Sequence, residues 1–236
     1  IEVELIDKIV DYFKQKAFEE NSDWYWNYRI SLTTNGVNYS SPKVRRFIEK
    51  NREKMSLSIT LDGTKEKHDM NRVFPDGSGS YDIIEKNIPL YIEDFYPTTK
   101  VTFSHNDLPL LKDSIIHLWN LGIVDVSANC VFENVWQDSD PKILEEQLIQ
   151  LADYMIENEL YKNYSVTFFD SNIGFPLSDE QKSKNVCGAG YMLGLGPTGK
   201  IYPCMRYKDY SLENKNEVVI GDVDNGIDID KIIRFR

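Results

Sequence analysis

The sequence predicts an α/β fold in which helices cover a parallel sheet. Segments with the composition of strands recur at intervals of roughly 30 residues, a spacing typical of βα units with right-handed connections. The segments between them have the periodicity of amphipathic helices. These two observations leave open a barrel-like sheet and a doubly wound sheet. In both architectures the chemistry lies at the carboxyl ends of the strands.

The predicted strands are apolar almost throughout, as expected for a sheet covered by helices. They are Tyr28–Thr33, Met55–Leu61, Thr99–Phe103, Asp125–Phe132 and Tyr164–Phe169. Turn-forming pairs, Asn35-Gly36 and Asp62-Gly63, end the first two. We expect the first four strands to be parallel and adjacent in chain order, with the strand that starts at Tyr28 at an exposed edge.

The predicted helices alternate with these strands. Residues 1–16 place Leu5, Ile9 and Phe13 on one face, and Ser41 caps a helix that starts at Pro42 and ends near residue 51. Further helices are expected at 81–94, 108–121 and 141–160, and a polar loop is expected between Gly63 and residue 80.

Composition excludes several classes of function. The 27 basic and 38 acidic residues give a net charge of −11 without a basic block, which argues against nucleic-acid binding. No apolar stretch approaches the length of a membrane span and no signal peptide is recognisable, so we expect a cytoplasmic protein without membrane contact. Three cysteines form no disulfide framework and fit a reducing compartment.

The composition changes after Leu177 to Gly, Pro, Cys and Tyr, so we expect one domain at 1–177 and a second at 178–236. In the second, Cys187 and Cys204 frame a hairpin whose turn is Gly196-Pro197-Thr198-Gly199. Two thiols at the base of a hairpin are half of a tetrahedral thiolate site for zinc or an iron–sulfur cluster.

Other candidate residues are polar side chains at the ends of the predicted strands. They are Thr33, Thr34, Asn35, Thr60, Asp62, Ser104, His105, Asn106, Asn129 and Cys130. We interpret the thiol of Cys130 as core packing, because it lies on an apolar strand. The histidines, at positions 68, 105 and 117, share no metal-ligand spacing, so structural roles are expected.

The run from Ser58 to Arg72, SITLDGTKEKHDMNR, resembles the fourth-strand segment of radical S-adenosylmethionine (SAM) enzymes. In that family the pattern is Ser/Thr-x-Asp-Gly followed by His-Asp-x-x-Arg. Residues 32–36, 100–106 and 126–131 resemble its third, fifth and sixth strands. The hairpin from Cys187 to Cys204, followed by Ile220-Gly221-Asp222-Val223, is similar to the opening of the SPASM extension, which carries auxiliary [4Fe–4S] clusters.

The resemblance implies a partial (β/α)6 TIM-like barrel that lacks its first two strands, followed by the start of a SPASM hairpin. Within the family the chain is most similar to peptide maturases, which modify ribosomally made peptides, often through thioether cross-links. A [4Fe–4S] cluster there reduces SAM, and the 5′-deoxyadenosyl radical abstracts a hydrogen from the peptide. The implied partners are a Cys-rich precursor peptide and an electron donor such as ferredoxin or flavodoxin.

The same resemblance assigns residues to the site. Thr60 and Arg72 would hold the SAM carboxylate, since a guanidinium matches a carboxylate bidentately. Asn35 and Ser104 occupy further cofactor-binding positions. Cys187 and Cys204 would ligate an auxiliary [4Fe–4S] cluster. No catalytic residue is assigned.

The chain also departs from the family. The defining Cys-x-x-x-Cys-x-x-Cys is absent, so we expect a fragment that is inactive by itself. Anaerobic sulfatase maturases, which make formylglycine, are the second hypothesis; they place Asp directly after the cysteine that ends the hairpin, where this chain has Met205. A degenerate binding module and a zinc-binding α/β protein that uses Cys187 and Cys204 are the remaining alternatives.

Overall fold

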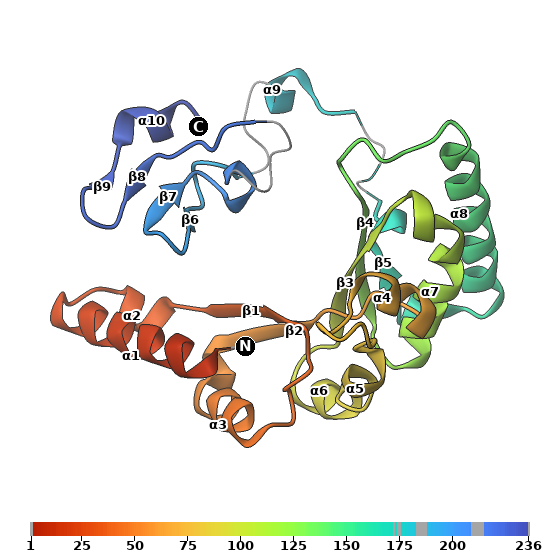
Figure 1. The fold of residues 1–236 in the computed structure, drawn as a ribbon, viewed down its shortest axis with the longest axis horizontal. Helices are drawn as coiled ribbons and strands as arrows, with labels where there is room; N and C mark the ends of the chain where they lie inside the picture. The colour runs from red at the N-terminus through yellow and green to blue at the C-terminus, as the bar shows by residue number, and fades with distance from the viewer. Residues whose placement is uncertain (1, 172, 174–175, 183–187, 209–214, 236) are drawn as a thin grey trace. The chain divides into compact units, whose positions relative to one another are not determined.

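The computed structural model describes residues 2–171, 173, 176–182, 188–208 and 215–235. The chain divides into two compact units, Ile1–Ile173 and Gly174–Arg236 (Figure 1). The first unit alternates helices with parallel strands, and the second is a small antiparallel sheet. The predicted α/β class is therefore confirmed. The assignment of residues 178–236 to a SPASM region stays a prediction.

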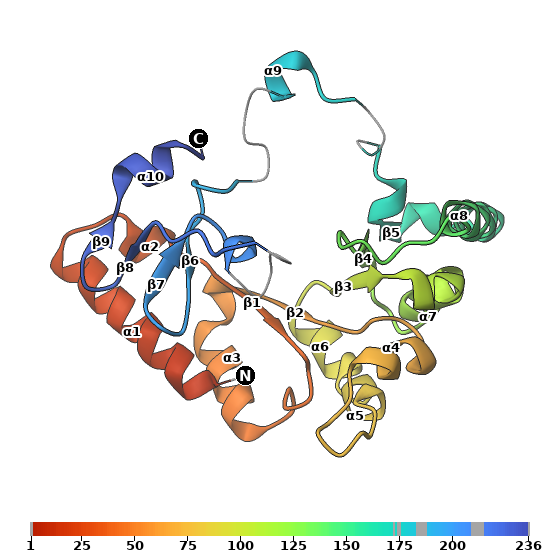
Figure 2. The ribbon, with the colours of Figure 1, turned by 45° about the horizontal axis from the view of Figure 1, so that its top comes forward.

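The described strands of the first unit form two parallel sheets. β1 (Ile30–Thr34) pairs with β2 (Met55–Ile59), and β3 (Thr98–Phe103), β4 (Asp125–Cys130) and β5 (Ser165–Val166) pair in that order. Figure 2 shows α7 and α8 on the same side of β3 and β4. As expected, β1 is an edge strand of its sheet in the described structure. β4 and β5 end earlier than predicted, and Phe132, which follows β4, is 81% exposed.

The expected row of four adjacent strands is interrupted between β2 and β3, which share no backbone ladder. A threonine hydroxyl connects them instead. Thr99 Oγ1 accepts from the backbone N–H of Leu61 (3.0 Å) and donates to the carbonyl of Ile59 (2.8 Å). On the other side of the strands, Ser58 Oγ donates to the carbonyl of Thr98 (3.2 Å). The two sheets are thus neighbours joined through side chains.

The expectation that the strands are apolar almost throughout is wrong, because buried and exposed positions alternate along them. Met55, Leu57 and Ile59 are buried in the core formed with the helices, whereas Ser56 between them is exposed. The strand register places the polar side chains together on the opposite face, which we call the polar face. It comprises Ser31, Thr33, Ser56, Ser58, Lys100, Thr102, Ser127 and Asn129. Since side chains alternate across a strand, helices on one side leave the other side polar.

The helices predicted for the first unit begin close to their expected positions, and the structure adds two short helices, at Trp24–Asn27 and Lys65–Asn71. The longer ones are α1 (Val3–Glu19), α3 (Pro42–Asn51), α7 (Leu111–Asn120) and α8 (Asp140–Glu157). The shorter ones are α2 (Trp24–Asn27), α4 (Lys65–Asn71), α5 (Tyr81–Glu85) and α6 (Ile88–Asp94). α4 lies within the segment that the sequence analysis expected to be a loop.

Two predicted helices differ from the structure at a proline: one is divided in two, and the other begins later than predicted. The helix expected at 81–94 is divided into α5 and α6, because Pro89 has no N–H to bond the carbonyl four residues earlier. The proline lies in the first turn of α6, where it is tolerated. Pro109 likewise falls in a 3₁₀ segment, His105–Leu110, and the α-helix begins only at Leu111.

The second unit contains four short antiparallel strands in the order β6 (Gly194–Leu195), β7 (Lys200–Tyr202), β8 (Gly221–Asp222) and β9 (Gly226–Ile227). α10 (Ile229–Ile233) follows, and its Ile232 is buried, as are Tyr202 and Ile220. β6 comprises two residues, and Tyr191 and Leu193 lie outside it and are exposed. None of the helices in the described ranges has the length and apolar composition to cross a membrane.

Candidate functional site

The candidate site lies at the connection between β2 and α4, where the chain leaves the carboxyl end of a parallel strand. Thr64 caps α4 by accepting from the backbone N–H of Lys67, and Arg72 ends the helix. The turn between strand and helix needs Gly63, which has a φ of +115° and lies against Ser114 of α7. The local sequence thus directs both ends of α4 toward the strand end.

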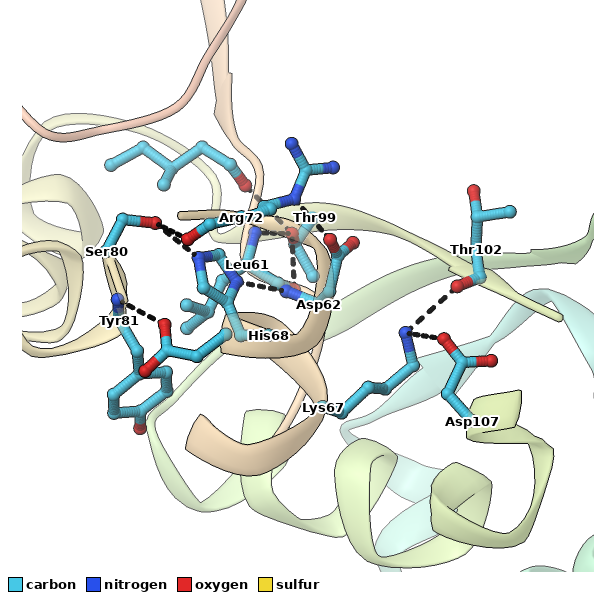
Figure 3. A network of polar contacts seen from close by, with 12 residues as sticks. Leu61, Asp62, Lys67, His68, Arg72, Ser80, Tyr81, Thr99, Thr102 and Asp107 are labelled. Carbon is cyan, nitrogen blue, oxygen red and sulfur yellow. Dashed lines mark hydrogen bonds and ion pairs between the residues drawn. The ribbon is translucent and has the colours of Figure 1, made fainter. Parts of the chain in front are cut away.

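Arg72 forms an ion pair with Asp62 at this strand end (Figure 3). Nε donates to Asp62 Oδ2, while the two terminal amino groups of the guanidinium point away from Asp62. The Asp62 side chain is 11% exposed and that of Arg72 is 39% exposed. Because Asp62 binds only through the Nε side, the outer edge of the guanidinium can bind a ligand carboxylate bidentately.

His68 lies beneath this pair and is fully buried. Its Nδ1 accepts from the backbone N–H of Asp62 (3.1 Å), and its Nε2 lies 3.0 Å from Ser80 Oγ. Burial lowers the pKa of this imidazole below its ordinary value of 6.5, so the ring is neutral at neutral pH. The histidine therefore has the structural role that the sequence predicts, and it is in direct contact with the Asp62 backbone.

Lys67 anchors α4 on its other side. Its side chain is 1% exposed, and Nζ donates to the carbonyl of Thr102 (2.9 Å) and pairs with Asp107 (3.1 Å). The ammonium also lies 4.5 Å from the ring centroid of Phe103. These contacts connect α4, which carries Arg72 at its end, to the end of β3.

The residues that the sequence assigned to SAM are distributed around this strand end. Thr60 directly follows β2, is buried, and donates its backbone N–H to the carbonyl of Thr34. Asn35 follows β1 and is exposed; its Oδ1 accepts from the N–H of Val37. Ser104 follows β3 and bonds Asp107 Oδ1 through its N–H (2.6 Å) and its hydroxyl (3.2 Å). The hydroxyl of Ser104 thus has a local partner, and the cofactor role of all three residues stays a prediction.

The thiols do not assemble into a ligand set in the described part of the chain. Cys187 lies outside the described residues. Cys204, which directly precedes Met205 in the sequence, has a partly exposed free thiol. Cys130 lines an apolar pocket with Trp136, and burial, with a smaller effect of the Asp107 charge, raises the pKa of its thiol. No group of three or more His, Cys, Asp or Glu in the described ranges is arranged to hold a metal. The described residues therefore do not fit a complete auxiliary cluster.

The other two histidines have structural partners, as predicted. His105 Nδ1 lies 2.9 Å from Asp140 Oδ1, and His117 is hydrogen-bonded to the hydroxyl of Tyr81. Burial lowers the pKa of His117.

Several solved structures share this architecture. One is "Native anSMEcpe with bound AdoMet", with 18% sequence identity and a TM-score of 0.65, in which the match covers 96% of this chain and 63% of that chain. A complex of native anSMEcpe with AdoMet and the Kp18Cys peptide has 18% identity, a TM-score of 0.62 and the same coverage. SuiB of Streptococcus suis has 16% identity and a TM-score of 0.51, covering 80% of this chain and 46% of that one.

The chain has the fold of radical SAM/SPASM enzymes. It spans less than two thirds of the length of the anSMEcpe and SuiB structures reported above. No protein-family model matches the sequence, and a search of the curated proteins finds no match. The structural similarity therefore supports the fold assignment alone, and the function has to be argued from the site.

Two residues of this candidate site were not predicted from the sequence. Asp62 was noted only as a strand-end residue, and His68 only as a structural histidine. Both lie inside the motif that identified Arg72, at ten and four residues before it. That spacing was the available signal. The path of the chain around α4 had to be known, however, before Asp62, His68 and Arg72 could be recognised as neighbours.

Proposed function

We propose that this chain is the SAM-binding part of a radical SAM/SPASM enzyme that modifies a ribosomally made peptide. The observation that carries the proposal is the orientation of Arg72, whose guanidinium is held by Asp62 and leaves its outer edge for a carboxylate. The fold shared with structures that contain AdoMet supports it.

In this proposal Arg72 binds the carboxylate of SAM, and Thr60 contributes beside it at the end of β2. Asn35 and Ser104 are the further cofactor-binding positions of the adjacent strand ends. SAM with a reduced [4Fe–4S] cluster supplies, when bound, a carbon radical that removes a hydrogen atom from the peptide. The chain contains no Cys-x-x-x-Cys-x-x-Cys motif for that cluster, so the residues present do not fit it and no step is assigned to it.

The polar face is the proposed contact surface for the peptide. Its side chains are uncharged except for Lys100, and most are exposed. Hydroxyl and amide groups form hydrogen bonds with peptide groups, which suits a substrate of varied sequence. Electrons would come from a ferredoxin or flavodoxin. A cytoplasmic location and an auxiliary cluster ligated by Cys187 and Cys204 belong to the same proposal.

Two products are compatible with this site. Met205, which follows Cys204, cannot accept a proton as the Asp of sulfatase maturases does, and this favours a thioether or related cross-link. The similarity to anSMEcpe, an anaerobic sulfatase maturase, favours formylglycine as the second candidate. Mass spectrometry of a Cys-containing peptide after anaerobic turnover separates the two. A cross-link removes two hydrogens and keeps the sulfur, whereas formylglycine formation from cysteine replaces the sulfur by an aldehyde oxygen.

The SAM assignment is tested by equilibrium dialysis with labelled SAM on anaerobically purified protein. Arg72→Ala removes a charge-assisted hydrogen-bonding partner, so we expect the dissociation constant to rise about 10- to 150-fold, equivalent to about 1.5–3 kcal/mol. Arg46→Ala, an exposed arginine of α3, is the matched control. Equal dissociation constants for the parent and Arg72→Ala would refute the assignment.

A further inference from the structure

A continuous chain of hydrogen bonds connects the two backbone segments that carry the Arg72–Asp62 pair. It begins at the backbone N–H of Asp62, which donates to His68 Nδ1 (3.1 Å). It continues from His68 Nε2 to Ser80 Oγ (3.0 Å) and from Ser80 Oγ to the carbonyl of Arg72 (2.8 Å). One imidazole therefore contacts the Asp62 backbone directly and the Arg72 backbone through a single hydroxyl (Figure 3).

The direction of this chain is fixed by its first donor. Since the N–H of Asp62 can only donate, Nδ1 of His68 carries no proton, and the proton of the neutral ring resides on Nε2. Nε2–H then donates to Ser80 Oγ, and the hydroxyl proton of Ser80 goes to the Arg72 carbonyl. Each bond in the chain is satisfied only by the neutral ring with the proton on Nε2.

We propose that His68 is a positioning residue that holds the Arg72 guanidinium and the Asp62 carboxylate in the orientation that receives the carboxylate of SAM. This inference rests on the proposed function for its ligand, but the hydrogen-bond chain can be tested without it. A buried imidazole pairs its nitrogens wherever it lies, so the identity of the partners distinguishes His68. Here both nitrogens are paired, and the chain ends at the two residues of the ion pair.

The charged surroundings of His68 give the proposal a pH dependence. Burial is the main effect on its pKa and lowers it; Asp62 and Asp69 favour the charged ring, and Arg72 and Lys67 oppose it. The ring of Tyr81 packs against the imidazole at 6.0 Å between centroids, without a charge. Once the ring is protonated, Nδ1–H faces the N–H of Asp62, and two donors cannot bond. The positioning is therefore present at neutral pH and is lost as pH falls through the lowered pKa of His68.

The test compares variants that keep or remove individual bonds. His68→Phe keeps the volume and removes both bonds, and His68→Asn retains an acceptor near the position of Nδ1. Two quantities are measured: the ¹⁵N–¹H signal of Arg72 Nε in the absence of SAM, and the dissociation constant of SAM. We expect His68→Phe to shift the Arg72 Nε–H signal and accelerate its exchange, and to raise the dissociation constant about 3- to 10-fold. His68→Asn should lie between this variant and the parent.

His117→Phe is the matched control, because His117 is partly buried and is also hydrogen-bonded, but to the hydroxyl of Tyr81 and not to the Asp62 backbone. It should leave the Arg72 signal and SAM binding unchanged. If His68→Phe does not fold, Ser80→Ala removes the hydroxyl that joins His68 Nε2 to the Arg72 carbonyl and gives the same readout, while the backbone N–H of residue 80 can still donate to that carbonyl (3.1 Å). In the parent, titrating the ¹⁵N signals of His68 should show the Nε2–H form at neutral pH and a change in the Arg72 signal on acidification.

The outcomes separate the two proposals. Equal SAM affinity for the parent and Arg72→Ala would reject the proposed function, while the Arg72 Nε–H signal would still decide on His68. A folded His68→Phe or Ser80→Ala variant with the parental Arg72 signal would overturn the positioning role. An Nδ1–H form of His68 at neutral pH would do the same.

Discussion

Replacement of Lys67 by alanine is expected to destabilise the first unit more than any exposed charge on the same helix. Lys67 Nζ lies 3.1 Å from Asp107 Oδ2 and 2.9 Å from the carbonyl of Thr102, and the two charged side chains are 1% and 3% exposed. The substitution therefore leaves a buried carboxylate without its cation. It also removes the contact with the ring of Phe103.

The expected loss follows from the burial of the pair. Removing one partner of a buried ion pair costs about 3–5 kcal/mol, because the remaining charge is neither paired nor hydrated. For a unit of this size that corresponds to a decrease in Tm of about 6–20 °C. Lys65→Ala is the matched control: Lys65 lies two residues earlier on α4, pairs with Asp69 and Asp82, and is 54% exposed. Its loss should cost at most about 1 kcal/mol.

Urea denaturation at pH 7, followed by far-UV circular dichroism, measures both variants. A third variant, Lys67→Ala combined with Asp107→Asn, removes the isolated charge and should recover part of the loss. It retains an amide oxygen at the position of the oxygen that accepts from the Ser104 N–H (2.6 Å). The reasoning is refuted if Lys67→Ala and Lys65→Ala unfold within about 0.5 kcal/mol of each other.

Three further predictions concern the same unit. Thr99→Val keeps the shape but removes the hydroxyl that joins β2 to β3, and should lower the free energy of unfolding in urea by about 1–3 kcal/mol; an unchanged midpoint would contradict this. Gly63→Ala should cost about 2–4 kcal/mol, because its Cβ would lie 2.3 Å from a side-chain atom of α7 at a φ of +115°. Gly77→Ala also has a positive φ but meets nothing within 4 Å, so its loss in the same assay should be smaller, about 1 kcal/mol. Burial opposes the ionisation of Asp94, but the hydrogen bond from Arg45 is among the contacts that hold its pKa below 3.8. This stabilisation is present above the unfolded pKa and disappears as pH falls through the lower folded pKa. It should be smaller in Arg45→Met in acid unfolding curves, because Tyr39 and Arg52 still contact Asp94.

The arrangement of helices and strands could be predicted because it depends on local patterns. Hydrophobic periodicity and turn residues located every strand of the first unit to within a few residues. The helix α4 was missed because its seven residues show no apolar stripe, although Thr64 in front of Lys67 is a capping signal. The alternation in MSLSITL was present in the sequence. The alternation predicts a polar face only if helices cover one face of the sheet and not both, and tertiary packing decides this.

The site was predictable only where a motif represents a residue directly. Arg72 was found in this way, but its pairing with Asp62 depends on the path of the chain around α4. The role of His68 depends on Ser80, twelve residues further along the chain. For Ser104, in contrast, the motif suggested a role that the local structure does not require. The resemblance assigned its hydroxyl to a cofactor, and the structure shows the hydroxyl bonded to Asp107 in a local cap.

The alternation within the strands has a consequence for the peptide contact that we propose for the polar face. Exposed polar positions such as Ser31, Ser56 and Ser127 contribute little to folding, and substitutions at such positions usually change stability by no more than about 0.5 kcal/mol. The residues between them form the core. In the proposed function, the residues that contact the peptide and the residues that stabilise the fold therefore occupy alternate positions of the same strands. A directed-evolution library that randomises only every second residue can search for new peptide specificities while the fold persists.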